Sequence, residues 1–303
     1  MKISPKKNTK NTVEITNPDK VLFGKSGLTK QDLVSYYQAI APFMMPYVKD
    51  RLVSMQRFPQ GIHGEIFFQK NAGDYFPSWI TRVPVAKQNG ETVDYVVIDK
   101  PETLVYLANQ VCVPHVWLST KDNLTKPDRM IFDLDPAPHL NFAAIQDVAK
   151  KLKALLDELE LPSFYMLTGS RGAHVVVPLK RIHSFEEVSE FAHDIAKVLA
   201  HQFPKLITVD MHKVKRGKRV FIDWLRNGFG ATAVPPYAVR AREGAPVAMP
   251  VTWQELQKKG MSSEKYTIKN AMKRLSKRGD LWKDMQKDAV TLTKARKKLN
   301  NMM

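Results

Sequence analysis

Cysteine is nearly absent from this chain of 303 residues, in which Cys112 stands alone. A disulfide within the chain is therefore excluded, and so is a cysteine-rich zinc module. Long apolar runs are also missing, because no stretch approaches the roughly 18 uninterrupted apolar residues of a membrane span. The start, Met1-Lys2-Ile3-Ser4, lacks the hydrophobic segment of a secretory signal. We therefore expect a cytoplasmic protein without a membrane span.

Negative charge is the scarcer sign: 30 acidic side chains face 47 basic ones, which gives a formal net charge of +17 and a pI near 9.7. Such an excess favours a polyanionic partner, with nucleic acid ahead of an acidic membrane surface. Much of the excess lies after Lys265, where Lys269, Lys273 and Lys277 recur at helical spacing. This basic segment is either a solvated helix surface or a contact for a phosphate backbone.

Helix and strand signals alternate along the chain. Thr29 and Asp32 form a capping-box pattern before an apolar helical stripe that should end at Pro42. The other expected elements are strands within 52–70 and over 95–98, a long helix over 142–159 and a capped helix over 184–199. Residues 1–12, rich in lysine and asparagine, should form a flexible basic arm. This mixture favours an α+β or mixed α/β sheet over a doubly wound parallel one.

The most informative passage is Met130-Ile131-Phe132-Asp133-Leu134-Asp135-Pro136. In a strand, Asp133 and Asp135 would point to one face while their apolar neighbours point into a core. Two adjacent carboxylates repel unless a cation lies between them, so the pair predicts a site for hard divalent metals. Asp223 ends a second β-branched and aromatic run and could converge on the same ions. By itself, a strand followed by Asp-x-Asp is more often structural than catalytic.

A polar loop, Thr-Gly-Ser-Arg-Gly-Ala-His, spans residues 168–174 between two apolar runs. Its two glycines allow close backbone approach, and Ser170, Arg171 and His174 supply hydrogen-bond donors suited to phosphate. The same residues would also serve in an ordinary polar hairpin turn. The loop is therefore either a phosphate cradle or a turn.

Together these motifs resemble the polymerase domain of bacterial ligase D, in the non-homologous end-joining branch of the archaeo-eukaryotic primase superfamily. The resemblance rests on Asn17-Pro18-Asp19-Lys20-Val21-Leu22-Phe23, Phe67-Phe68-Gln69-Lys70-Asn71-Ala72, Phe132-Asp133-Leu134-Asp135-Pro136 and Phe221-Ile222-Asp223-Trp224. It implies an α+β fold with a primase-polymerase type core, an antiparallel-rich central sheet flanked by helices, and a smaller N-terminal subdomain. The domain would span residues 13–295 and would be followed by a basic tail over 296–303.

The resemblance also implies roles for individual residues. Asp133, Asp135 and Asp223 match carboxylates that hold two divalent cations, Mn²⁺ or Mg²⁺, with manganese favoured. The positions that match nucleotide-binding residues are His115, Thr168, Ser170, Arg171, His174, Arg216 and Arg240, and Arg226 would add positive charge near the nucleotide. The positions that match DNA-binding residues are Lys20, Lys30, Phe67, Phe68 and Lys70. The first two would grip the 5′-phosphate of a downstream strand, and the phenylalanines would stack on a template base.

Several of these positions also have a plain structural interpretation. A lone histidine such as His115, within Val113-Pro114-His115-Val116-Trp117, is more often structural than functional. Without the resemblance, Lys20 and Lys30 would pass as surface lysines. Adjacent phenylalanines in a strand would bury one ring and expose the other.

The implied function is that of a metal-dependent nucleotidyltransferase, which extends primers and fills gaps at DNA double-strand breaks and prefers ribonucleotides. Its partners would be gapped or broken DNA with a 5′-phosphate, an NTP or dNTP, Ku, and a separate ATP-dependent DNA ligase. A separate ligase is expected because the chain has no Lys-x-Asp-Gly adenylation motif. The protein would work in the cytoplasm, associated with the nucleoid, and would not bind membranes.

Three other functions remain open. A primase that starts chains de novo would carry the same motifs. A phosphatase with an aspartyl nucleophile also opens with a strand and Asp-x-Asp, but it usually continues with Gly-Thr where this chain has Pro136-Ala137-Pro138. A non-catalytic DNA-end-binding protein needs only the charge of +17, yet three carboxylates would repel phosphates in the absence of metal.

Overall fold

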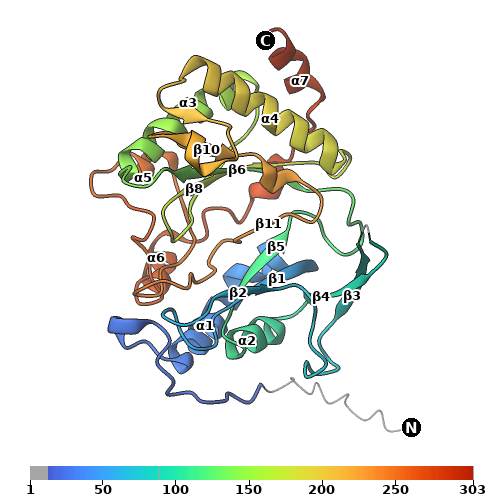
Figure 1. Ribbon diagram of the computed structural model, residues 1–303, viewed down its shortest axis with the longest axis vertical. Helices are drawn as coiled ribbons and strands as arrows, with labels where there is room; N and C mark the ends of the chain where they lie inside the picture. Colours follow the sequence, from blue (N-terminus) through green and yellow to red (C-terminus); the bar gives the residue numbers. More distant parts are fainter. Residues whose placement is uncertain (1–12, 88, 303) are drawn as a thin grey trace.

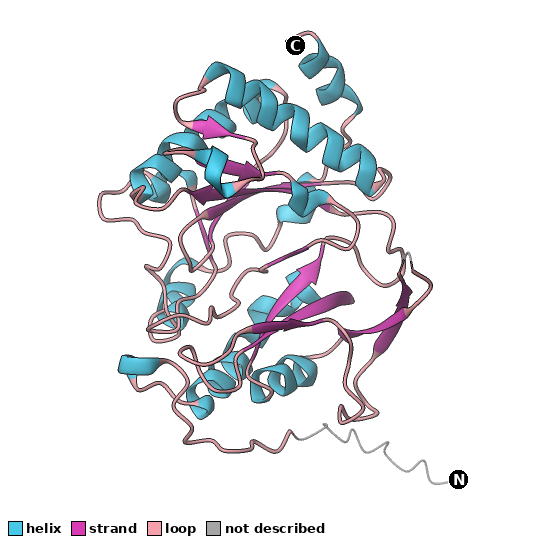
Figure 2. Cartoon of the chain, in the orientation of Figure 1, coloured by secondary structure: helices cyan, strands magenta, loops and turns pink. Residues whose placement is uncertain are grey.

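The computed structural model describes residues 13–87 and 89–302 (Figure 1). The expected basic arm, residues 1–12, lies outside the described residues. Two six-stranded sheets dominate the architecture, one in each half of the molecule. Figure 2 shows both sheets towards the middle of the molecule and the long helices on its outer sides.

The N-terminal sheet has the strand order β11-β5-β1-β4-β3, with β2 also paired to β1. Its strands are β1 (Arg51–Arg57), β2 (Phe67–Gln69), β3 (Arg82–Ala86), β4 (Thr92–Ile98), β5 (Cys112–Trp117) and β11 (Thr232–Ala233). All of these pairings are antiparallel. Helices α1 (Lys30–Val48) and α2 (Pro101–Asn109) pack against each other on the outer side of this sheet.

The second sheet has the strand order β12-β7-β8-β6-β10-β9. Its strands are β6 (Arg129–Pro136), β7 (Phe164–Leu167), β8 (Ala173–Pro178), β9 (Ile207–Thr208), β10 (Val220–Asp223) and β12 (Met249–Val251). Its pairings are antiparallel apart from that of β10 with β9. Helices α3 (Phe142–Glu158) and α4 (Phe185–Gln202) cover its outer face. The predicted α+β class with antiparallel-rich sheets is confirmed.

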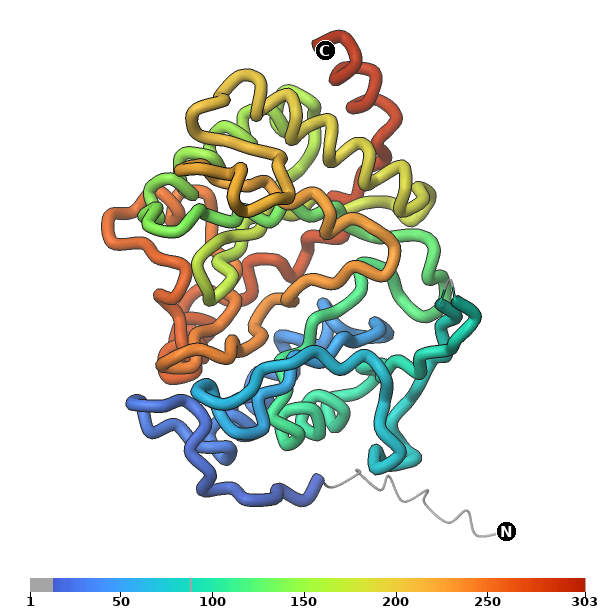
Figure 3. Tube along the Cα trace, viewed as in Figure 1, coloured from blue at the N-terminus to red at the C-terminus, as the bar shows by residue number. Residues whose placement is uncertain are grey.

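The two sheets are connected by the chain itself, because β11 lies in the N-terminal sheet while β10 and β12 lie in the other. Figure 3 shows this orange segment leave the upper half, reach the lower half and return. The shorter elements are η1 (Gly24–Ser26), η2 (Lys213–Arg216), η3 (Leu225–Asn227), α5 (Trp253–Leu256), α6 (Ala271–Arg278), η4 (Met285–Asp288) and α7 (Thr293–Asn300). Within the described ranges, no helix is long and apolar enough to cross a membrane.

Helix α1 begins as predicted but runs past its predicted end. The side chain of Thr29 accepts a hydrogen bond from the Asp32 amide, which closes the capping box. The helix then continues through Pro42 and Pro46 to Val48. Proline removes a backbone donor and crowds the preceding turn, but the apolar stripe stays buried beyond Pro42, and this packing outweighs the local cost. The predicted end at Pro42 was therefore wrong.

The other predicted helices are confirmed as α3 and α4, the second of which is capped by Ser184 and Glu187. The predicted start of a basic tail at residue 296 falls inside helix α7. There, Leu299 is buried and Lys298 Nζ lies 2.8 Å from Glu160 Oε1. Helix α7 thus packs on the same body as α3.

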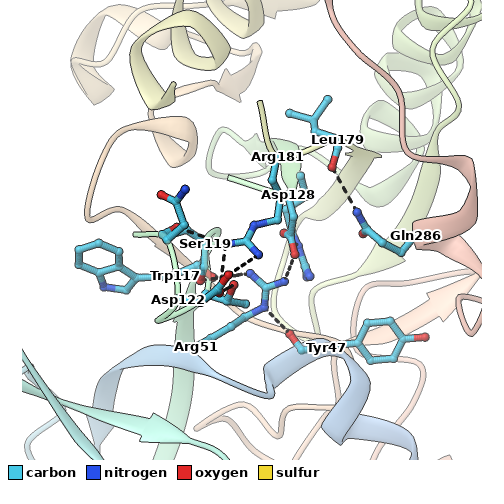
Figure 4. Close-up of polar contacts among 12 residues, drawn as sticks. Tyr47, Arg51, Trp117, Ser119, Asp122, Asp128, Leu179, Arg181 and Gln286 are labelled. Atoms are coloured by element: carbon cyan, nitrogen blue, oxygen red, sulfur yellow. Dashed lines mark hydrogen bonds and ion pairs between the residues drawn. The ribbon is translucent and has the colours of Figure 1, made fainter. Parts of the chain in front are cut away.

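A buried ionic network joins the two halves at one end of β1 (Figure 4). Arg51, at the start of β1, is 3 % exposed and forms an ion pair with Asp128, the residue before β6. The Arg51 guanidinium also donates to the backbone carbonyls of Tyr47, at 2.9 Å, and Trp117, at 3.2 Å. Burial lowers the pKa of Arg51 to about 10, and Arg129 adds to this effect while Asp128 opposes it. The network fixes the first strand of one sheet to the central strand of the other.

Candidate active site

Three aspartates lie on one face of the paired strands β6 and β10. The antiparallel register places Asp223 directly opposite Asp133, and Asp135 follows two residues further along β6. Directly opposed residues share a face of the sheet, as do residues two apart in one strand. The predicted alternation is confirmed, since Phe132 and Leu134 are fully buried on the other side. The sequence-based proposal that the three acids converge is therefore matched by the strand register.

Strand β8 brings a histidine to the same place from the other side of β6. His174 is opposite Asp133 in the β6–β8 register, and its Nε2 lies 3.6 Å from Asp133 Oδ1. Burial by itself would raise the pKa of Asp133, but His174, Arg226 and Arg240 overcome it and lower that pKa to about 2. Burial raises the pKa of Asp223, and the Asp133 charge adds to the rise while Arg226 opposes it. The surroundings thus lower the pKa of Asp133 and raise that of Asp223, although the two carboxylates face each other.

Arginines neutralise all three carboxylates. Arg226 Nε lies 3.2 Å from Asp133 Oδ2 and 3.2 Å from Asp223 Oδ2, so one guanidinium bridges the pair. Arg216 Nη1 lies 3.1 Å from Asp135 Oδ2. The guanidinium carbon of Arg216 lies 3.9 Å from the centroid of the Phe221 ring, on which the guanidinium stacks. Like charges this close are unfavourable without cations between them, and guanidinium groups supply that charge here.

The donor set suits a divalent metal, although arginines pair with all three carboxylates. Carboxylate oxygens are the ligands that Mn²⁺ and Mg²⁺ prefer. Among the described residues, no three His, Cys, Asp or Glu side chains are close enough together to hold a metal ion in this arrangement. A cation bound by Asp133, Asp135 and Asp223 would therefore replace guanidinium groups, above all that of Arg226 between two of the acids.

A cavity of about 380 Å³ opens beside these strands and takes its walls from both sheets. Asp133 and Asp135 line it from β6, and Gln56 lines it from β1. The predicted nucleotide-binding residues that line it are His115, Thr168, Ser170, Arg171, His174 and Arg240. Asp223 and Arg216 lie behind this wall. Asp223 pairs with Arg226 and Arg216 pairs with Asp135, and both of these partners line the cavity. The cavity lies in the cleft where the two halves meet.

His115 and Phe68 are the aromatic part of the wall contributed by the N-terminal sheet. Their rings meet edge to face, with centroids 5.3 Å apart. Burial lowers the pKa of His115 to about 3, with help from the Arg240 charge, so its imidazole is neutral at physiological pH. Phe67 and Phe68 are 37 % and 56 % exposed, so neither ring is buried. The structural alternative of one buried and one exposed ring is wrong, because β2 pairs only with β1 and lies off the main path of the sheet.

The loop over 168–172 is a hairpin turn and also part of the cavity wall, so the two alternatives drawn from its sequence, a turn or a phosphate cradle, are compatible. It is the hairpin turn between β7 and β8, and it lines the cavity with Ser170 and Arg171. A Cβ on Gly172 would lie 2.1 Å from the Leu134 carbonyl oxygen, so only glycine permits this approach to β6. The Thr168 hydroxyl donates to the Gly172 carbonyl at 3.0 Å and is 5 % exposed, which makes its main role the closure of the turn.

Lys20 and Lys30 lie side by side, away from the cavity wall. The Lys30 amide donates to the Lys20 carbonyl at 2.9 Å. The Lys20 ammonium donates to Gln60 and the Lys30 ammonium to Thr16, at 2.9 and 2.8 Å. Burial lowers the pKa of Lys30, and the charges of Lys20 and Arg57 lower it further. Two lysines on neighbouring backbone whose ammonium groups have no carboxylate partner among the described residues form a site suited to an anion.

Two polar residues of the site escaped the sequence analysis. Arg242 Nη1 donates to the Ser170 hydroxyl at 3.2 Å. Asn227, fully buried, donates to the Ile131 carbonyl at 2.8 Å and accepts from the Ile131 amide at 2.7 Å, which fixes β6 two residues before Asp133. The sequence offered one indication of their role: Asn227 follows Asp223 closely, and Arg242 follows Arg240.

The fold and the cavity define a class of protein: a two-sheet α+β domain whose strand-borne carboxylates share a cleft with hydroxyl and guanidinium groups, as expected of a primase-polymerase. The particular family follows from the sequence of the whole chain. The profile of "LigD, primase-polymerase domain" matches residues 29–282, and the chain belongs to this family.

Known relatives agree with this assignment. The chain is 34 % identical over 280 residues to the multifunctional non-homologous end joining protein LigD of Mycolicibacterium smegmatis, covering 91 % of this chain and 36 % of the relative. It is 30 % identical to the bifunctional protein LigD of Bacillus subtilis, covering 88 % of this chain and 43 % of the relative. The chain thus spans less than half the length of these relatives.

A solved structure shares the fold. The polymerase domain of Mycobacterium tuberculosis Ligase D, in complex with DNA, superposes with a TM-score of 0.86 at 31 % identity. The match covers 93 % of this chain and 100 % of that one. The predicted fold and the predicted family are both confirmed.

Proposed function

We propose that this chain is a metal-dependent nucleotidyltransferase that extends primers and fills gaps at DNA double-strand breaks in non-homologous end joining. One observation carries the proposal: carboxylates and a set of hydroxyl and guanidinium donors line a single cleft. Asp133 and Asp135 provide the first, while Ser170, Arg171 and Arg240 provide the second. A binding protein for polyanions gains nothing from carboxylates in its cleft, whereas a polymerase needs both kinds of group.

The basic and polar wall would bind the nucleotide. Ser170, Arg171 and Arg240 are the donors that would take the triphosphate, since hydroxyl and guanidinium groups match phosphate oxygens. The Nδ1 atom of the neutral His115 lies 3.4 Å from the Val113 carbonyl oxygen, so the ring would offer its other nitrogen, Nε2, to the sugar or base. Asp133, Asp135 and Asp223 would hold two divalent cations, Mn²⁺ or Mg²⁺. When bound, these cations would lower the pKa of a primer 3′-hydroxyl and balance the triphosphate charge.

The N-terminal half would bind the DNA. The exposed rings of Phe67 and Phe68 are suited to stacking on template bases. Lys70 beside them is also exposed, and its ammonium group would contact the phosphate backbone. Lys20 and Lys30 would take the terminal 5′-phosphate of the downstream strand. The solved Ligase D polymerase domain is in complex with DNA, which supports DNA binding by this chain. Ku and a separate ATP-dependent ligase are the partners that the family resemblance suggests.

Primer extension tests the proposal. A gapped duplex is offered with Mn²⁺ or Mg²⁺ and with rNTPs or dNTPs in separate reactions, beside Asp135→Ala as the matched control. We expect the wild type to add nucleotides, ribonucleotides faster, and the variant to add none. Equal activity of the two proteins would contradict the assignment. DNA binding that is indifferent to Mn²⁺, without any incorporation, would identify a non-catalytic DNA-end-binding protein instead.

A further inference from the structure

Lys20 and Lys30 stand at the two ends of a single closed loop. The Leu22 amide donates to the Leu28 carbonyl at 2.9 Å, and Lys30 donates through its backbone to Lys20. The lysines therefore lie at the base of this loop, and Lys25 is at its tip. Since the loop is cross-linked by backbone hydrogen bonds, a shift at the base is transmitted to the tip.

The tip of this loop is held by a carboxylate from the other half of the chain. Glu243 Oε1 accepts from the Ser26 amide at 2.7 Å, and Glu243 Oε2 accepts from the Lys25 amide at 3.2 Å. Gly24 has φ of +53°, and a Cβ there would lie 2.5 Å from both Glu243 Oε2 and His63 Nε2. The positive φ favours glycine at this position, and a larger residue would also have to displace the Glu243 carboxylate and the His63 ring.

Glu243 belongs to a tight turn that also contacts the nucleotide cleft. The Arg242 amide donates to the Arg240 carbonyl at 2.8 Å, and the Ala245 amide donates to the Arg242 carbonyl at 3.0 Å. From this turn, Arg242 reaches the Ser170 hydroxyl and Arg240 donates to the Thr168 carbonyl at 2.9 Å. One short turn therefore touches the loop over 20–30 on one side and Thr168 and Ser170 of the loop over 168–172 on the other.

We propose that the turn over 240–245 couples the two sites, so that a phosphate bound at Lys20 and Lys30 raises the affinity of the cleft for a nucleotide, with Glu243 as the positioning residue. This inference rests on the proposed function of both sites. A terminal phosphate competes with Gln60 and Thr16 for the two ammonium groups, so its arrival rearranges the base of the loop. Glu243 passes this change to Arg242 and Arg240. By linkage, the nucleotide must tighten phosphate binding by the same factor.

Equilibrium binding measures this coupling without turnover. A gapped duplex with a dideoxy-terminated primer carries either a 5′-phosphate or a 5′-hydroxyl at the gap, and a fluorescent nucleotide is titrated against each complex in the presence of Mn²⁺. For the wild type we expect the phosphate to tighten nucleotide binding about fivefold, the lower end of the range for coupled sites, because Glu243 is exposed. Glu243→Ala should bring this ratio to about one. Its nucleotide affinity on 5′-hydroxyl DNA and its melting temperature should stay at the wild-type values.

Two further variants sharpen the test. Glu243→Gln keeps one acceptor but loses the charge, so its ratio should lie between those of the wild type and the alanine variant. Glu186→Ala, which removes an exposed glutamate from the start of α4, should keep the wild-type ratio. A full ratio in Glu243→Ala, or a ratio of one in the wild type, would overturn the coupling.

The proposed function is tested separately by extension of an ordinary primer under the same conditions. Extension by a wild type that ignores the phosphate leaves the polymerase assignment intact and removes the coupling. Nucleotide binding that tightens with the 5′-phosphate, in a protein that extends no primer, supports the coupling and removes the polymerase assignment.

Discussion

Removal of the Asp128 carboxylate should destabilise the whole molecule, because it leaves the charge of Arg51 buried without its partner. The two residues are 8 % and 3 % exposed, so solvent screens neither charge well. Breaking a buried ion pair by deleting one partner costs about 3–5 kcal/mol. Unfolding entropy is about 2 cal/mol/K per residue, or roughly 0.6 kcal/mol/K for this chain, so Asp128→Ala should lower Tm by about 5–8 °C.

Thermal and urea unfolding measure this loss, and the same network provides the control. Asp122→Ala breaks the ion pair with Arg181, whose side chains are 63 % and 34 % exposed, and should cost no more than about 1 kcal/mol. The double variant Arg51→Met with Asp128→Leu removes both charges of this pair and should recover part of the stability. The recovery should be incomplete because Arg129 Nε, 2.9 Å from Asp128 Oδ1, also loses its partner. A loss in Asp128→Ala as small as that in Asp122→Ala would refute the argument.

The same pair sets a pH dependence. Burial opposes ionisation of Asp128, but Arg129 and Arg51 together hold the pKa of this carboxyl well below its usual range. A carboxyl with a depressed pKa in the folded state stabilises the protein above its ordinary pKa, and this stabilisation is lost as the pH falls towards the folded-state value. The wild type should therefore lose more stability between neutral pH and strong acid than Asp128→Ala does.

Three predictions concern the site itself. Asp133→Ala or Asp223→Ala should abolish nucleotide addition in a primer-extension assay, by a factor of about 1,000 or more, because each removes a ligand for the cations that stabilise phosphoryl transfer. DNA affinity, measured by anisotropy, should change less than about twofold in the same variants, and a variant that still extends primers normally would contradict their role. Lys20→Ala with Lys30→Ala should erase the advantage of a 5′-phosphorylated gap over an unphosphorylated one, and Lys269→Ala with Lys273→Ala should leave it unchanged. The pKa of Asp223 is raised, so as the pH falls this carboxylate should take up its proton before Asp133 does. Mn²⁺ affinity should therefore begin to fall at a higher pH than it would if Asp223 had the ordinary pKa of an aspartate. A titration of Mn²⁺ binding between pH 4 and pH 7 checks this order.

The acidic centre could be predicted because its signal is local. Alternation in a strand puts Asp133 and Asp135 on one face whatever the sheet contains. That Asp223 faces Asp133 depends on the pairing of β6 with β10 and on its register, which the 83 residues between Pro136 and Val220 do not reveal from local pattern. Arg226 and Asn227 reach back to β6 from a short turn, and no periodicity in the sequence marks such a turn.

The N-terminal sheet was harder to predict than the second sheet. Strand β5 contains Pro114, which argues against a strand by its missing amide. Pro114 pairs with Met55 of β1, while β11 pairs only with Val116 and Trp117. The proline therefore lies at a locally open edge, where no amide is needed. An element of this kind becomes visible only when its neighbours are known.

The position of the cleft shows why both halves are needed for the proposed chemistry. The second sheet supplies every carboxylate, and a bare acidic centre would repel a triphosphate. The arginines that offset it come from the segments around β10 and β11, and the exposed rings of Phe67 and Phe68 come from the N-terminal sheet. The Arg51–Asp128 pair fixes these two sets of groups to each other. A change in this pair should therefore alter nucleotide addition as well as stability, although neither residue lines the cavity.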